Sequence, residues 1–152
     1  MKNSVIKMLV ISLLVAGLMG CTIAAPVITS GTYEGLTNTA PDKGTIFVYR
    51  ESSLGGVTNQ YDVMVNGVLA GSLPNGSFFS VDVDPGEYTV EPRTLTAFGF
   101  GKGSVITVEK GKSYCLKLTL NFCLQCKSAD IDIVDAKQCE NEIKSLKKVQ
   151  LK

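Results

Sequence analysis

The five cysteines are the residues of this chain whose type and spacing could carry chemistry. Four of them lie in the C-terminal third, and two of these form a Cys-x-x-Cys pair, Cys123 and Cys126. In an exported domain an even set of this kind predicts two disulfides, with zinc binding or free thiols as alternatives. A thioredoxin-type enzyme places its pair at a helix N-terminus in a βαβ unit. This pair lies in a β-hairpin, so redox catalysis is only an alternative function.

Other candidate catalytic groups give weaker signals. Asp82 and Asp84 share one face of a strand and its end, which could suit acid–base work or Ca²⁺ binding. A solvent-facing residue and an Asp-Pro-Gly turn explain them more simply. The glycines at 99, 101 and 103 precede a strand, whereas a phosphate loop precedes a helix N-terminus. The chain has no histidine, the commonest general base and metal ligand. We expect no catalytic residue, no metal site and no enzymatic activity.

Three side chains are candidates for ligand contact. Arg50 could recognise a ligand or pair with a neighbouring carboxylate. Phe98 and Phe100 flank the glycine loop and could stack on a sugar, insert into a partner or collapse onto the domain end. Phe78 and Phe79 are adjacent, so on a strand one of them should point away from the core. The net charge of +1 gives no electrostatic basis for nucleic-acid binding.

The elements that must position these residues are strands. A length of 152 residues supports one domain, and segments of alternating polarity follow one another with turn residues between them. Asn66-Gly67 is typical of a type I′ hairpin turn. About eight short antiparallel strands predict an all-β fold, a small β-sandwich with one C-terminal helix. The expected strands lie near residues 45–50, 61–65, 68–73, 79–83, 88–96, 104–108, 114–120 and 130–134.

The last hairpin has a register that its side chains specify. A turn centred on Leu124-Gln125 places Leu118 opposite Ile131 and Leu116 opposite Ile133. Apolar residues then face apolar residues, and Asp130 and Asp132 share the outer face with Lys117 and Thr119. This agreement on both faces favours the register.

After this hairpin, Asp135 is placed to cap a helix whose apolar residues recur through Cys139 and Ile143 to Leu146 and Val149. Lysines 144, 147, 148 and 152 would lie at its C-terminal end, where the helix dipole favours cations. The register puts Cys115 opposite the residue before the helix cap. Of three connectivities we favour Cys115–Cys139, which requires the helix to pack over the outer sheet face, and Cys123–Cys126 across the turn.

The N-terminus has the pattern of an export signal. Lys2 and Lys7 precede an uncharged apolar run that ends Leu18-Met19-Gly20-Cys21 and resembles the bacterial lipobox. The resemblance implies residues 1–20 as signal peptide, cleavage after Gly20 and a lipid on Cys21, the only cofactor-like group expected. Two alternatives remain: an ordinary cleaved secretory signal, or an uncleaved anchor, because the uncharged stretch continues to Ile28.

Residues 21–43 are small, polar and interrupted by prolines, which predicts a lipidated cysteine and a flexible tether before a domain at 44–152. The segments GTIFVYR (44–50), YDVMVNGVLAGSL (61–73), NGSFFSVDVDPGEYTV (75–90) and SVITVEKGKSYCLKL (104–118), with the Glu/Lys-rich C-terminal helix, resemble a family of bacterial lipoproteins catalogued as a domain of unknown function. The hairpin and the Pro-Gly corner are also similar to PEGA-type sandwiches. The resemblance implies a sandwich, an envelope location and no assigned activity.

These features together predict an envelope lipoprotein. Thr22 follows the cysteine, where Asp would favour the inner membrane, so the lipoprotein resemblance implies the outer membrane, facing the periplasm. We expect a non-catalytic binding or structural module that meets the membrane through its lipid and contacts an envelope protein or a glycan. A periplasmic thiol–disulfide protein using Cys123 and Cys126 is the alternative.

Overall fold

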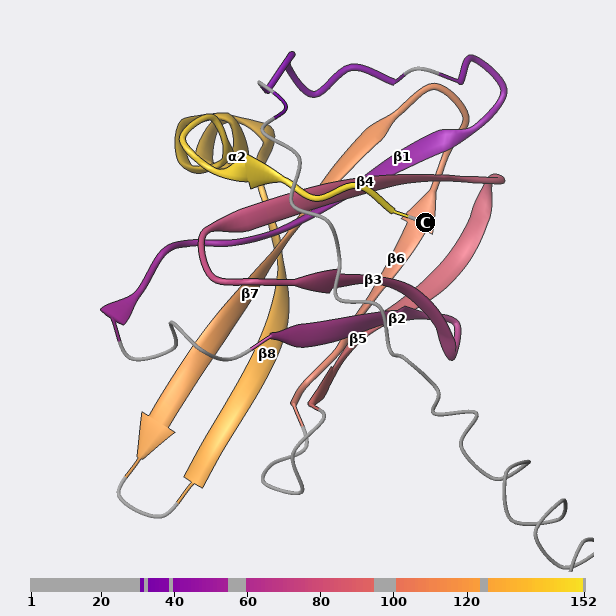
Figure 1. Ribbon diagram of the computed structural model, residues 1–152. Helices are drawn as coiled ribbons and strands as arrows, with labels where there is room; N and C mark the ends of the chain where they lie inside the picture. Colours follow the sequence, from indigo (N-terminus) through magenta and orange to yellow (C-terminus); the bar gives the residue numbers. More distant parts are fainter. Residues whose placement is uncertain are drawn as a thin grey trace, which may run out of the picture.

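The computed structural model describes residues 31, 33–38, 40–54, 60–94, 101–123 and 126–151, and these form two stacked β-sheets and a helix (Figure 1). The strand order is β8–β7–β1–β4–β9 in the first sheet and β3–β2–β5–β6 in the second. The predicted all-β sandwich with a helix near the C-terminus is confirmed. The elements are β1 (Gly44–Arg50), β2 (Tyr61–Val65), β3 (Val68–Leu73), β4 (Ser77–Val83), β5 (Gly86–Thr94), β6 (Ser104–Val108), β7 (Ser113–Cys123), β8 (Cys126–Val134), α2 (Ala136–Ile143) and β9 (Lys147–Lys148).

Two strand pairs differ from the antiparallel arrangement expected throughout. β1 pairs with β7 in parallel, with Val48 beside Leu116, and β4 pairs with β9 in parallel, with Ser77 beside Lys147. Parallel neighbours need a long connection between them. The chain meets that need because β2 to β6 lie between β1 and β7, and β5 to β8 and α2 lie between β4 and β9.

β1 is the central strand of the first sheet, and both of its faces are buried. On one face Ile46 and Val48 enter the core between the two sheets. On the other face Phe47 and Tyr49 join a second apolar cluster outside the first sheet. The unbroken run of apolar and aromatic side chains at residues 46–49 is what burial on two sides requires.

The second cluster is covered by α2 and by part of the N-terminal segment. Phe79 points into the main core and Phe78 points away from it into this second cluster, so the two face opposite sides as predicted, and both are buried. The ring of Tyr33 meets Phe78 edge-on at 6.0 Å between centroids, and Leu36 packs on the same cluster. Residues 33–38, expected in the flexible tether, therefore contact the domain, because the outer sheet face is apolar and needs a cover.

The helix begins where the sequence predicts and ends earlier. The Asp135 side chain accepts a hydrogen bond from the backbone N–H of Gln138, which confirms the N-cap. The helical residues end at Ile143 instead of continuing to Val149. The backbone N–H of Val149 donates to Phe78 O at 2.8 Å, so the final residues pair with β4 and return Val149 to the core. Pairing with β4 takes the place of the last two helical turns that the sequence predicts.

The predicted hairpin features are confirmed in the backbone. Asn66 and Gly67 both have positive φ, 48° and 76°, as a type I′ turn requires. β7 and β8 pair in the predicted register, with Leu118 opposite Ile131 and Lys117 opposite Asp132.

Candidate functional site

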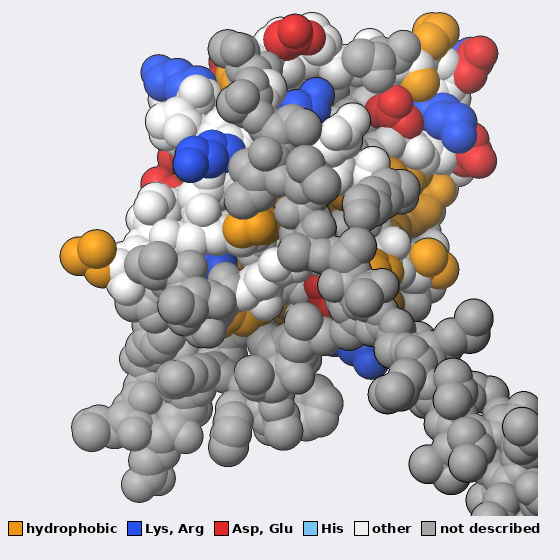
Figure 2. Space-filling view, in the orientation of Figure 1, with side chains coloured by type: hydrophobic (Ala, Val, Ile, Leu, Met, Phe, Trp, Pro, Cys, Tyr) orange, Lys and Arg blue, Asp and Glu red, His pale blue; other side chains and the backbone are white. Residues whose placement is uncertain are grey.

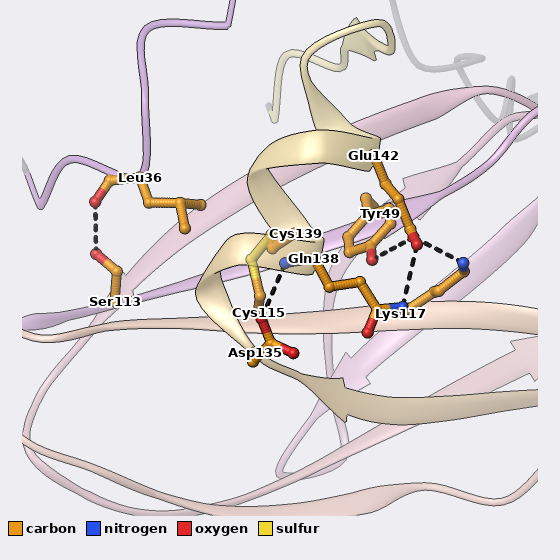
Figure 3. Close-up of a disulfide and its surroundings, with 9 residues drawn as sticks. All are labelled: Leu36, Tyr49, Ser113, Cys115, Lys117, Asp135, Gln138, Cys139 and Glu142. Atoms are coloured by element: carbon orange, nitrogen blue, oxygen red, sulfur yellow. Dashed lines mark hydrogen bonds and ion pairs between the residues drawn. A yellow bond between two sulfur atoms is a disulfide. The ribbon is translucent and has the colours of Figure 1, made fainter.

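The most highly connected group of side chains lies where α2 crosses the first sheet (Figure 3). A disulfide joins Cys115 on β7 to Cys139 on α2, with 6.2 Å between the Cα atoms, and it confirms that predicted pair. Cys115 lies on the face of β7 opposite to Leu116, and Cys139 is buried on the side of α2 that faces the sheet. The bond therefore holds the helix over the outer face of the sheet, as the pairing required.

A polar group next to the disulfide fastens the same helix a second time. Glu142 on α2 accepts the Tyr49 hydroxyl at 2.8 Å and lies 2.6 Å from Lys117 Nζ. Lys117 also contacts a carboxylate oxygen of Glu51 at 2.5 Å, and Gln138 Nε2 donates to Glu142 at 3.0 Å. Figure 3 shows Tyr49 and Lys117 converging on Glu142 from below the helix. We call Cys115, Cys139, Tyr49, Lys117 and Glu142 the α2 clamp.

The protonation states of the clamp are fixed by this arrangement. Burial alone would raise the pKa of Glu142, but hydrogen bonds from its neighbours outweigh it and lower the pKa. Burial would lower the pKa of Lys117, yet its two carboxylate partners hold that pKa above the usual value. Burial and the hydrogen bond to Glu142 together raise the pKa of Tyr49 far above its ordinary value. Glu142 and Lys117 thus stay charged, and Tyr49 stays neutral, across the physiological range.

The clamp is suited to holding structure in place. A general acid or base works best when its pKa lies near the working pH, and all three shifts move away from neutrality. The sequence predicted the disulfide but not the contacts that Tyr49 and Lys117 make with Glu142. One signal was available: Glu142 lies between Cys139 and Ile143, the helix residues that face the sheet, so its carboxylate had to meet a partner there.

Arg50, the first candidate for ligand contact, lies inside the protein. Its side chain is 1% exposed, and its guanidinium carbon is 5.0 Å from the centre of the Tyr61 ring. Burial lowers the pKa of this guanidinium, although it stays charged. Arg50 is buried because both faces of the central strand β1 are covered, and a ligand contact through it stays a prediction.

The two carboxylates considered for acid–base chemistry meet different neighbours. The Thr45 hydroxyl donates to Asp82 at 2.6 Å, across the β1–β4 pair. Asp84 lies 3.7 Å from Lys43 Nζ in an exposed ion pair. In the part of the chain that the structure describes, no three His, Cys, Asp or Glu side chains group as a metal site would require.

The end of the glycine loop is docked on the edge of β8. The Ile131 N–H donates to Lys102 O at 2.8 Å, and the Ser104 hydroxyl donates to Ile131 O at 2.6 Å. A Cβ at Gly101 would overlap the carbonyl oxygen of Ala129, so only glycine permits this approach. Residues 101–104 thus cover part of an edge strand and tie the second sheet to the first.

Comparison with known proteins identifies the family. Residues 40–129 match the family described as "Protein of unknown function (DUF2846)". The chain belongs to this family. The DUF2846 match spans β1 to β7 and the start of β8, so α2 and the clamp residues Cys139 and Glu142 lie after the matched region. No curated protein and no solved structure matches the chain significantly.

Several predicted site residues lie outside the described part of this DUF2846 protein. These are Cys21 with the rest of residues 1–30, and Phe98 and Phe100 in the glycine loop. The backbone register places Cys123 directly opposite Cys126, at the end of the β7–β8 hairpin, and their side chains are not described. Their predicted disulfide stays a prediction. Among the described residues, no helix has the length and hydropathy needed to cross a bilayer.

Proposed function

We propose that this protein is a lipoprotein of the bacterial envelope, anchored in the outer membrane by a lipid on Cys21. The observation that carries the proposal is the Cys115–Cys139 disulfide in the folded domain. Disulfides persist in oxidising compartments, to which the N-terminal export signal would deliver the chain. Lipidation of Cys21 would also leave an even number of cysteines in the domain. The two features, far apart in the sequence, agree on one compartment.

Mass spectrometry of the mature protein tests the anchor. We expect an N-terminal peptide that begins at Cys21 and carries the lipid, and no such peptide from a Cys21→Ser variant. Alkylation without reduction should leave Cys115 and Cys139 unlabelled. A mature protein that begins elsewhere, or a Cys21→Ser protein with the same lipidated mass, would contradict the proposal.

We propose further that the domain is a non-catalytic module that contacts an envelope protein or a glycan. The two outer faces of the sandwich differ, and this difference supports a contact role for the second sheet. The outer face of the first sheet is covered by α2 and residues 33–38. On the second sheet the side chains of Leu69 and Val105 are 55% and 57% exposed, and Val68 at the β2–β3 hairpin is 70% exposed. Exposed apolar side chains on a sheet face are suited to contact with another molecule.

Crosslinking from intact membranes tests the contact role. A Leu69→Ser/Val105→Ser protein should recover less of any protein or glycan that crosslinks to the wild type. Ile133→Ser is the matched control, because Ile133 is 53% exposed and lies on the first sheet. Equal recovery by all three proteins, or loss with Ile133→Ser alone, would count against the second sheet as the contact surface.

A further inference from the structure

The basic residues of the chain are concentrated at its C-terminus. Residues 144–152 contain four lysines and no acidic residue, whereas residues 22–143 contain nine basic and fourteen acidic residues. A short positive segment therefore follows a negative domain. Separation of charge of this kind points to a partner with negative charge on one side of the molecule.

The structure describes residues 144–151 of this basic segment, with three of its lysines. Lys144 caps α2, Lys147 and Lys148 form β9, and all three side chains are exposed. The Lys147 N–H donates to Gly76 O at 3.1 Å, and the buried Val149 follows in the core. Glu140 lies one helical turn before Lys144, whereas Lys147 and Lys148 lie in a stretch, residues 144–151, that contains no acidic residue. In Figure 2 basic side chains lie on the part of the surface near α2 and β9.

The N-terminal segment reaches the folded domain at the same corner. A Cβ placed on Gly31 would lie 3.4 Å from the Cβ of Lys148, so the two chain segments are in contact there. Cys21 precedes Gly31 by ten residues, which span at most about 35 Å when fully extended. A lipid on Cys21 would therefore keep this corner near the bilayer.

We infer that Lys144, Lys147 and Lys148 form a membrane-contact surface that binds the headgroups of anionic phospholipids. This inference rests on the lipid anchor proposed above and adds a second, electrostatic contact to it. In this arrangement the side chains of Lys144, Lys147 and Lys148 face the bilayer. Each lysine close to an anionic surface strengthens the contact by about five-fold at physiological ionic strength.

The test is the rate at which each lysine is acetylated in the lipidated protein on vesicles. The protein is reconstituted into vesicles of phosphatidylcholine alone or with phosphatidylglycerol, treated with an impermeant amine-acetylating reagent, and mapped by mass spectrometry. We expect Lys147 and Lys148 to react about five-fold more slowly on the anionic vesicles. High salt should remove the difference. The exposed Lys102 and Lys110 are internal controls whose rates should not change.

A charge variant supplies the second measurement. On anionic vesicles Lys144 should also be acetylated more slowly in the wild type. The Lys147→Gln/Lys148→Gln protein should lose this slowing at Lys144, and the matched Lys102→Gln/Lys110→Gln protein should retain it. Equal acetylation of Lys147 and Lys148 on both vesicles would overturn this inference and leave the anchor intact. A mature N-terminal peptide without lipid would instead overturn the anchor, and this inference with it.

Discussion

Replacing both cysteines of the Cys115–Cys139 disulfide with alanine should destabilise the domain strongly. The bond joins residues 24 apart, and the chain-entropy model gives about 3.5 kcal/mol for a loop of that length at 25 °C. Both side chains are buried, at 4% and 0% exposure, so the lost sulfur packing adds about 1 kcal/mol. Small domains are stable by about 5–15 kcal/mol, so the double variant should lose a large part of its stability.

Urea unfolding of the wild type and the variants measures this loss. The chain has five tyrosines and no tryptophan, so tyrosine fluorescence and circular dichroism are the suitable signals. The matched control is Cys123→Ala/Cys126→Ala, which removes two cysteines and keeps the Cys115–Cys139 bond. Its residues are three apart, and a disulfide closing so short a loop would contribute no more than about 2 kcal/mol.

Hydrogen exchange in the same variants should distinguish the contribution of the disulfide from that of the polar contacts of the α2 clamp. Tyr49 and Lys117 still hold Glu142 when the disulfide is absent, so the α2 amides should remain protected from hydrogen exchange below the unfolding transition. If only the α2 amides lost their protection from hydrogen exchange, the disulfide and not the polar contacts would hold α2 on the sheet. A Cys115→Ala/Cys139→Ala protein within about 1 kcal/mol of the wild type would refute the argument from loop closure.

Three further predictions concern single positions. Asp135→Ala should lower the free energy of unfolding by about 1 kcal/mol, while Asp135→Asn, which keeps an accepting oxygen, should retain most of it. Gly101→Ala should cost about 1–3 kcal/mol in urea unfolding, because its Cβ overlaps Ala129 O, whereas Gly31→Ala should be neutral. Because the folded protein lowers the pKa of Glu142, the ionised Glu142 side chain stabilises the domain fully above its unfolded pKa of about 4.3. This stabilisation is lost as the pH falls through the folded pKa of Glu142. Stability measured against pH should show this acid loss, and Glu142→Gln should reduce it; an unchanged pH profile would contradict the assignment.

The features that sequence predicts well here are those with a local or pairwise cause. Asn66-Gly67 specifies its turn because the backbone requires positive φ at both residues. The register of β7 and β8 follows from alternating side chains, since a shift by one residue would expose Leu116 and Leu118. The Cys115–Cys139 disulfide then followed from that register together with the helix cap.

The features that sequence did not predict depend on distant neighbours. The pattern of apolar residues indicates which faces of a strand are buried and does not indicate whether its neighbour is parallel, so the parallel β1–β7 pairing was not predicted. Helical spacing after Ile143 competes with backbone pairing to β4, and the pairing prevails. The burial of Arg50 and its contact with the Tyr61 ring depend on neighbours from other strands, which the sequence of β1 does not reveal.

The parallel pairing of β1 with β7 has a consequence for the order in which the chain folds. β1 stands directly after the N-terminal segment, and one of its two neighbours is contributed by residues 113–123. The central strand therefore keeps an open edge until most of the chain has been synthesised. Contacts of such long sequence separation form slowly, because loop closure must precede them. The first sheet therefore cannot be completed around β1 before residues 113–123 are available, which would keep this sheet open through most of the synthesis of the chain.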